Sequence, residues 1–246
     1  MTTDDGRTCF AWFEERARAV RDMRDDVAAP GASADVGRDR AALWARAKWV
    51  PGQIIGVAFL GASDALAARV LAAARAWVGP GMANLELQLR LDPADADLRV
   101  AFVPGGSWSV VGTTCRLRPK AEPTMNLGWL DDATPDDELR AVVLHEFGHA
   151  LGLIHEHASP AGGIRWNRDA VYADLSGPPN CFTRRQIDAN MFQAWDAAET
   201  NFTAFDAASI MLYPIPAAWT LDGFSVGLNT TLSPTDKSFI AAQYPF

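Results

Sequence analysis

The sequence predicts an α+β fold, in which strands and helices share the first half of the chain and a mostly irregular second half ends in a helix. Three observations predict this class. Leucines alternate with polar residues over 85–91, which is the period of a half-buried strand. Apolar residues recur at helical spacing over 66–78 and over 139–151. Beyond these helices, capping signals mark only two more in the second half.

Each element has its own local signal. Apolar or alternating runs predict strands over 54–60, 85–91 and 98–103. Residues 124–130 have two open interpretations: an exposed edge strand at the rim of a cleft, which would bind an extended substrate, or an internal strand. Residues suited to N-capping predict four helix starts, at Ser63, Thr134, Thr183 and Ser233.

Composition and charge narrow the classes of partner. The 246 residues are 49% hydrophobic and 21% charged, which is ordinary for a globular protein. The net charge of −8, from 30 acids against 22 bases, disfavours contact with phosphate backbones, so we expect no nucleic-acid partner. Since no run approaches the ~20 apolar residues of a membrane helix, we expect no membrane partner. We expect a monomer.

The N-terminus and the cysteines bear on compartment. Charges of both signs recur between Arg7 and Asp26, so no secretory signal is predicted. The three cysteines are Cys9, Cys115 and Cys181. An odd, sparse set is a poor disulfide framework, and either one bridge between Cys115 and Cys181 or three free thiols is compatible with it. The expected location is cytoplasmic, or outside the cell by a route without a signal.

All four histidines lie between His145 and His157. His145 and His149 are four residues apart on a predicted helix, so their imidazoles share one face. Gly152 supplies the left-handed conformation that ends a helix, and His155 follows three residues later. Three neutral imidazoles leave a fourth position for water, which is typical of a catalytic zinc site. His157 falls outside this spacing and is interpreted as a structural residue.

Glu146 is the predicted general base. It follows His145 by about 100° of helical rotation, so it can face the water on the metal without being a ligand. Zinc lowers the pKa of that water to about 7. Glu146 would accept the proton as the water attacks a carbonyl, and would pass it to the leaving amine.

The histidine segment is similar to the H-E-x-x-H-x-x-G-x-x-H pattern of the metzincin peptidases. That family also has a downstream Met-turn, and the sequence offers Met211 within Ser-Ile-Met-Leu-Tyr. Glu156 directly after the third histidine and Tyr213 two residues after the methionine resemble the astacin-like branch, and the span from about residue 44 onward resembles bacterial zinc metalloproteases close to it.

The resemblance implies a two-lobed zincin: a twisted mixed sheet with helices, a mostly irregular second lobe with a final helix, and a zinc-containing cleft between them. We therefore expect a segment or linker over 1–40 and a metallopeptidase domain over 41–246, with lobes 41–155 and 156–246. One Zn²⁺ ion, a protein or peptide substrate and a role of Tyr213 in stabilising the oxyanion are also implied. Within 1–40 a short amphipathic helix is expected near the start, because Phe10, Phe13, Ala17 and Val20 recur at helical spacing.

The predicted function is that of a zinc-dependent endopeptidase with His145, His149 and His155 as ligands and Glu146 and Tyr213 as catalytic residues. An alternative from another class is a metal-stabilised binding or scaffold protein that has the fold without turnover. Two departures from secreted astacins stand out. No signal peptide is recognised, and three cysteines cannot form their two disulfides.

Overall fold

The computed structural model describes residues 9–11, 43–160, 163–177, 181–193, 198, 200–202 and 204–246. Its main element is a six-stranded mixed sheet in the order β1-β6-β7-β5-β3-β4. The strands are β1 (Cys9–Ala11), β3 (Ile54–Leu60), β4 (Glu86–Leu89), β5 (Leu98–Ala101), β6 (Ser107–Ser109) and β7 (Met125–Asn126). Strands β4, β3, β5 and β7 are parallel, whereas β6 is antiparallel to β7.

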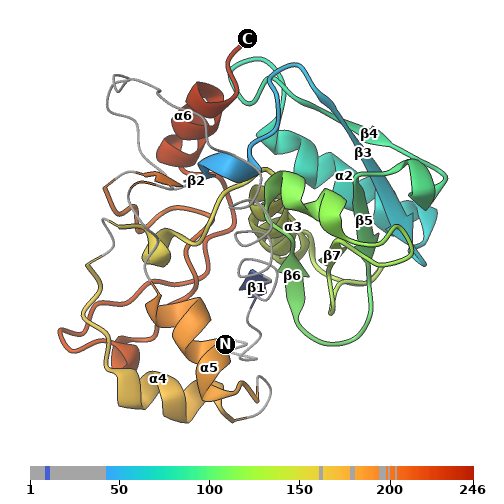
Figure 1. Ribbon diagram of the computed structural model, residues 1–246. Helices are drawn as coiled ribbons and strands as arrows, with labels where there is room; N and C mark the ends of the chain where they lie inside the picture. The colour runs from blue at the N-terminus through green and yellow to red at the C-terminus, as the bar shows by residue number, and fades with distance from the viewer. Residues whose placement is uncertain are drawn as a thin grey trace.

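Some of the helices lie beside this sheet, and the others lie on the opposite side of the molecule (Figure 1). They are α2 (Asp64–Ala74), α3 (Asp136–Ala150), α4 (Arg168–Leu175), α5 (Arg184–Ile187) and α6 (Pro234–Gln243). Short 3₁₀ turns and a π-helical turn at Asp188–Phe192 connect them. A two-stranded sheet pairs β2 (Leu43–Trp44) with β8 (Thr200–Asn201). The observed class is the predicted α+β fold.

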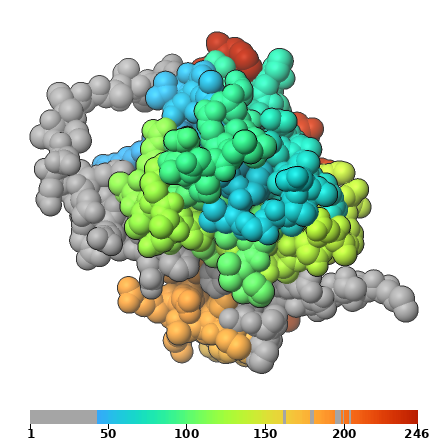
Figure 2. Space-filling view, turned by 90° about the vertical axis from the view of Figure 1, so that its right-hand side faces the viewer, coloured from blue at the N-terminus to red at the C-terminus, as the bar shows by residue number. Residues whose placement is uncertain are grey.

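Most of these elements are held together by two of the apolar clusters among the described residues. The larger core lies between the main sheet, α2 and α3, and it also contains Leu232, Phe239, Ile240 and Tyr244 from the C-terminal end. The smaller core joins α4, α5 and the segment from Leu212 to Trp219. In the side view, residues of the sheet and α2 form one continuous face, with the region of α5 below it (Figure 2). None of the described helices is long and apolar enough to span a membrane.

Local capping accounts for most helix starts. The Ser63 hydroxyl accepts from the Leu66 amide at 3.0 Å. The helix starts predicted at Thr183 and Ser233 are confirmed, and each forms a reciprocal capping box, with Gln186 and Asp236 respectively. Thr134 is different, because its hydroxyl closes a turn with Asp131 and the N-cap of α3 is Pro135, without a side-chain cap. The predicted N-cap was wrong by one residue.

Three further expectations are corrected. Residues 125–126 pair with β5 on one side and β6 on the other, so the edge-strand interpretation of 124–130 is wrong and the internal one is confirmed. Phe10 lies in β1, so it is not part of a helix; Phe13, Ala17 and Val20 lie outside the described residues. Cys115 and Cys181 are both free thiols, so the bridge between them is absent.

Gly148 lies in the interior of α3, where a glycine has an entropic cost, because its missing side chain makes room for a neighbour. A Cβ at this position would lie 2.3 Å from the sulfur of Met211 and 3.2 Å from the Trp77 ring. Both neighbours are buried, at 1% and 0% exposure. The contact therefore brings the segment of Met211 directly against the helix that carries His145 and His149.

We expect Gly148→Ala to force Met211 away from α3 and to lower the free energy of unfolding by about 1–3 kcal/mol, the usual effect of overpacking. Urea denaturation would measure this, with zinc content determined in the same samples. Gly227→Ala is the matched control, since a Cβ there has open space around it. Equal stability of the two variants would contradict the close packing of Met211.

Candidate metal centre

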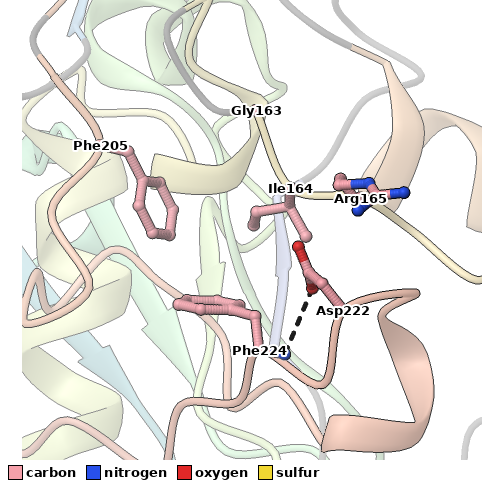
Figure 3. A pocket seen from close by; sticks show the side chains of 6 residues that line it. All are labelled: Gly163, Ile164, Arg165, Phe205, Asp222 and Phe224. Carbon is pink, nitrogen blue, oxygen red and sulfur yellow. Dashed lines mark hydrogen bonds between the residues drawn. The ribbon is translucent and has the colours of Figure 1, made fainter.

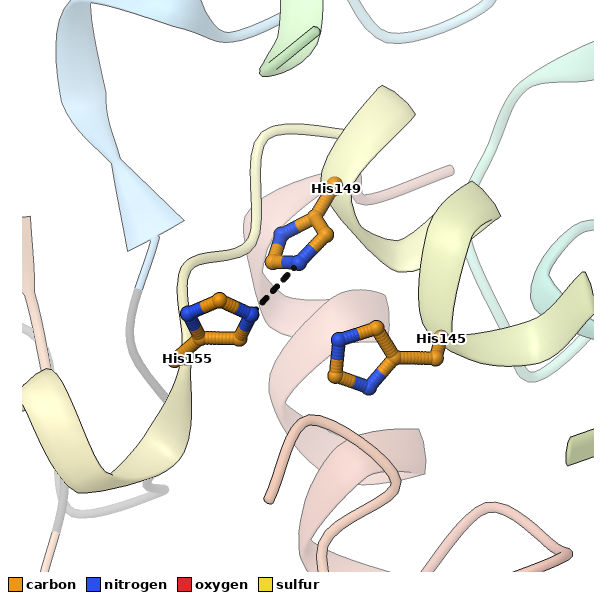
Figure 4. A group of neighbouring side chains, drawn as sticks. All are labelled: His145, His149 and His155. Atoms are coloured by element: carbon orange, nitrogen blue, oxygen red, sulfur yellow. Dashed lines mark hydrogen bonds between the residues drawn. The ribbon is translucent and has the colours of Figure 1, made fainter. Parts of the chain in front are cut away.

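Two elements bring the three predicted ligands together (Figure 4). His145 and His149 project from successive turns of α3, and His155 comes from the segment beyond the helix. Gly152, with φ of +96°, ends the helix in the predicted left-handed conformation. One ring nitrogen from each histidine lies within 4.8 Å of the other two. The three histidines that the sequence motif contains therefore lie together in the folded chain.

Backbone carbonyls fix the orientation of two of the rings. His145 Nδ1 lies 2.8 Å from the carbonyl of Ile210, and His149 Nδ1 lies 2.9 Å from that of Leu153. A carbonyl only accepts, so each Nδ1 carries the proton and each Nε2 presents a lone pair. This arrangement is the one that metal-ligating histidines use.

The donor set fits a zinc ion. In the described part of the chain no group hydrogen-bonds to the buried Nε2 of His145, and His149 Nε2 and His155 Nε2 are 3.1 Å apart. Tetrahedral zinc with Zn–N distances near 2.0–2.1 Å requires nitrogens about 3.3 Å apart. Lone pairs that converge in this way repel one another unless a cation lies between them. The three imidazoles therefore suit the zinc ion that the sequence motif implies.

Burial keeps the imidazoles in the ligating form. All three rings are nearly inaccessible, with exposures of 6%, 0% and 0% for His145, His149 and His155. Burial lowers the pKa of His145 to about 4 and those of His149 and His155 well below their ordinary value. Neutral imidazole, the form that binds metal, is thus favoured at neutral pH.

Three further predicted residues, Glu146, Tyr213 and Met211, are near this cluster. Glu146 is on α3 next to His145 and is 0% exposed. The ring of Tyr213 packs 4.3 Å from that of His155 and 5.6 Å from that of His145, measured between centroids. The Met211 carbonyl accepts from the Glu156 amide at 3.0 Å, which joins the methionine segment to the residue after the third ligand.

Two buried carboxyl groups, of Asp236 and Glu156, hydrogen-bond to segments next to the histidine cluster. Asp236, from α6, accepts from the Ile210 amide at 2.9 Å and from the Ser209 hydroxyl at 2.7 Å. Glu156 accepts from the Asp206 amide at 2.9 Å, and burial raises its pKa to about 8. Asp236 thus fixes the turn whose Ile210 carbonyl orients His145. The sequence predicted only the helix start at Ser233 here and no contact of Asp236 with the Ile210 segment.

His157 is not part of the ligand group. Its Nε2 lies 2.7 Å from the Asn190 carbonyl, and its ring stacks on His155 at 5.1 Å with an interplanar angle of 16°. The structural interpretation fits this packing.

A separate hollow of about 150 Å³ lies between Phe205, Phe224, Ile164 and Arg165 (Figure 3). Asp222 borders it and accepts from the Phe224 amide at 3.3 Å. None of the three histidines lines this hollow.

Comparison with known proteins identifies the family. Two solved structures of myroilysin are 41% and 40% identical to this chain, with TM-scores of 0.80 and 0.63. The matches cover 83% and 82% of this chain, and 98% and 87% of the myroilysin chains. The chain belongs to the astacin-like zinc metallopeptidases. The resemblance drawn from the histidine pattern is thus confirmed.

More distant similarity extends to high choriolytic enzyme 1, a hatching-enzyme zinc protease from the medaka fish Oryzias latipes. It is 20% identical, with a TM-score of 0.54, and the match covers 80% of this chain and 92% of that one; at this identity the likeness shows the fold. No protein-family model and no curated protein sequence matches. The similarity to myroilysin and the group of three histidines together identify this metallopeptidase as a zinc-dependent endopeptidase with one zinc ion.

A first test of the site concerns pH. Burial lowers the pKa of His157 to about 4 from an ordinary 6.5. Between these values the unfolded metal-free chain binds a proton that the folded chain does not, so stability falls as pH drops through this window. The free energy of unfolding should therefore decrease less on acidification in His157→Phe than in the wild type, by up to about 3 kcal/mol.

Urea denaturation of chelator-treated protein from pH 7 to pH 4 would measure the effect. His157→Gln serves as the second variant, since it keeps a donor for the Asn190 carbonyl without titrating. An unchanged pH dependence in both variants would show that His157 titrates normally.

Proposed function

We propose that His145, His149 and His155 hold the zinc ion and that Glu146 is the general base for hydrolysis of internal peptide bonds. The observation that carries this proposal is the convergence of three buried imidazole nitrogens within 4.8 Å. A buried carboxylate on the same helix, next to the first ligand, supports turnover over the scaffold alternative.

The zinc ion, when bound, supplies Lewis acidity that polarises the scissile carbonyl and lowers the pKa of water. Glu146 accepts a proton from the attacking water while the new C–O bond forms. It then gives that proton to the leaving amine as the C–N bond breaks. Because Glu146 is inaccessible to bulk solvent, the proton it holds is retained for the leaving group.

Tyr213 and Met211 complete the proposed site. The Tyr213 ring packs against two of the ligands, so its hydroxyl is proposed to donate to the oxygen that becomes negative during attack. Met211 is proposed to be the methionine of a Met-turn, an apolar support for the ligands. Its close contact with Gly148, between His145 and His149 on α3, supports that role.

The substrate is a protein or peptide. We further propose that the enzyme acts as a monomer without nucleic-acid or membrane partners, which the net charge of −8 supports for nucleic acid. The proposed metallopeptidase domain spans 41–246, with lobes 41–155 and 156–246, and residues 1–40 precede it. The pairing of β1 with β6 brings part of that preceding segment to the edge of the sheet.

Glu146→Ala tests the general base. We expect bound zinc to be retained, because Glu146 is not a ligand, and cleavage to fall by at least about 100-fold. Casein digestion with and without a chelator would be measured beside zinc content, with Glu146→Gln as the isosteric variant. Wild-type cleavage by either variant would refute the mechanism. A wild type that binds zinc but shows no chelator-sensitive proteolysis would favour the scaffold alternative.

Tyr213→Phe tests the oxyanion role. Losing one preorganised donor is expected to lower kcat by about 10²–10³-fold with little change in KM. Zinc content should be unaltered, since the aromatic ring that packs on His155 is kept. Steady-state kinetics on a fluorogenic peptide would give both constants. An unchanged kcat would reduce Tyr213 to a packing residue.

A further inference from the structure

The third ligand does not come from a helix, so something else must hold it in place. Residues 150–154, here called the ligand turn, connect His149 to His155. At its start the Gly152 amide donates to the His149 carbonyl at 2.8 Å, and the Leu153 amide donates to the Gly148 carbonyl at 3.0 Å. This pair of bonds ends α3 as a Schellman motif. It leaves the following carbonyls without partners inside the turn.

Side chains from opposite ends of the domain meet two of those carbonyls. The Trp49 indole donates from Nε1 to the Ala150 carbonyl at 2.8 Å. The Tyr244 hydroxyl donates to the Leu151 carbonyl at 2.6 Å. Both side chains are buried, at 2% and 0% exposure. Burial also raises the pKa of Tyr244, so its hydroxyl remains a donor at any working pH.

The backbone near the start of the domain meets the rest of the turn. The Trp44 amide donates to the Gly152 carbonyl at 3.0 Å, and Leu43 forms an isolated antiparallel bridge with Leu153. The Leu153 carbonyl accepts from His149 Nδ1. Every carbonyl from Gly148 to Leu153 therefore has a hydrogen-bond donor, and most donors lie outside the turn.

Trp49 and Tyr244 also contact each other. The Trp49 amide donates to the Tyr244 hydroxyl at 3.3 Å, across 195 positions of sequence. The single hydroxyl of Tyr244 therefore links the entry of the domain, its last helix and the ligand turn. In Figure 1 the chain near β2 and the end of α6 accordingly lie side by side above α3.

We infer that Trp49 and Tyr244 are positioning residues for the metal: by bonding Ala150 and Leu151, they hold the ligand turn so that His155 stays in reach of the zinc bound by His145 and His149. The inference rests on the proposed function, because it takes His155 to be a ligand. It assigns a role in zinc retention to two residues that are remote from the ligands in sequence and touch no reacting atom.

Tyr244→Phe is the sharpest test, since it keeps the ring and removes only the hydroxyl. With the Leu151 carbonyl left unsatisfied, we expect release of zinc to a chromogenic chelator to be about 10-fold faster, in line with other outer-shell substitutions. The kcat at saturating zinc should stay within about twofold of wild type, because Glu146 and Tyr213 are unchanged. Cobalt(II) substitution would add an absorption spectrum that reports ligand geometry.

Trp49→Phe is the second variant and should also speed zinc release. Trp77→Phe is its matched control, because Trp77 is equally buried and donates from Nε1 to an α3 carbonyl, that of Leu144, at 2.9 Å. Leu144 lies within the helix and outside the ligand turn, so this variant should lose stability without faster zinc release. Melting temperatures of the metal-free proteins would show whether Trp49→Phe and Trp77→Phe lose similar stability, so that their rates of zinc release can be compared.

Two results would overturn the inference. One is wild-type zinc release by both Tyr244→Phe and Trp49→Phe; the other is equally fast release by Trp77→Phe at the same loss of melting temperature. Failure of the proposed function would look different, because the wild type itself would then lack zinc or Glu146→Ala would still cleave. If Tyr244→Phe does not fold, Trp49→Phe against Trp77→Phe decides the question.

Discussion

The bond from each of two imidazoles to a backbone carbonyl is the interaction on which the site depends. His145 donates to Ile210 and His149 donates to Leu153. Each bond fixes the tautomer and the rotation of the ring, so that Nε2 faces the metal position. A helix alone brings two histidines to one face, but it does not choose which nitrogen points inward. That choice is made by carbonyls that come from outside the helix or from its very end.

Those carbonyls must themselves be held, and this requirement accounts for much of the buried polar structure. Ile210 is fixed through its amide by Asp236, whose other oxygen accepts from Ser209. Burial raises the pKa of Asp236, whereas the hydrogen bonds from Ile210, Ser233 and Ser209 favour its charged form. Burying a carboxylate is costly unless its oxygens are satisfied, and here they are. The last helix thus contributes to ligand geometry through its N-terminal capping box.

The sequence predicted what depends on near neighbours. The ligand spacing, the end of α3 at Gly152 and the capping boxes at Thr183 and Ser233 follow from residues a few positions apart. It did not predict what depends on distant ones. Residues 125–126 lie inside the sheet only because β6 returns antiparallel beside them, and a short strand has no local signal for its neighbours. Thr134 was misread for a local reason, since its hydroxyl is used by the turn at Asp131.

Gly148 is a local sequence signal that indicates a distant contact, the packing of another segment against α3. A glycine inside a helix is unfavourable, and between two proposed ligands it indicates close approach of another segment. The structure identifies that segment as Met211, 2.3 Å from where a Cβ would stand. The same helix therefore meets three constraints over residues 145–152: imidazoles on one face, the Met211 sulfur on another, and an abrupt end that leads to His155. A shift of this helix in register would move both imidazoles away from His155, and the part of α3 that carries them is buried from Ala141 to Ala150.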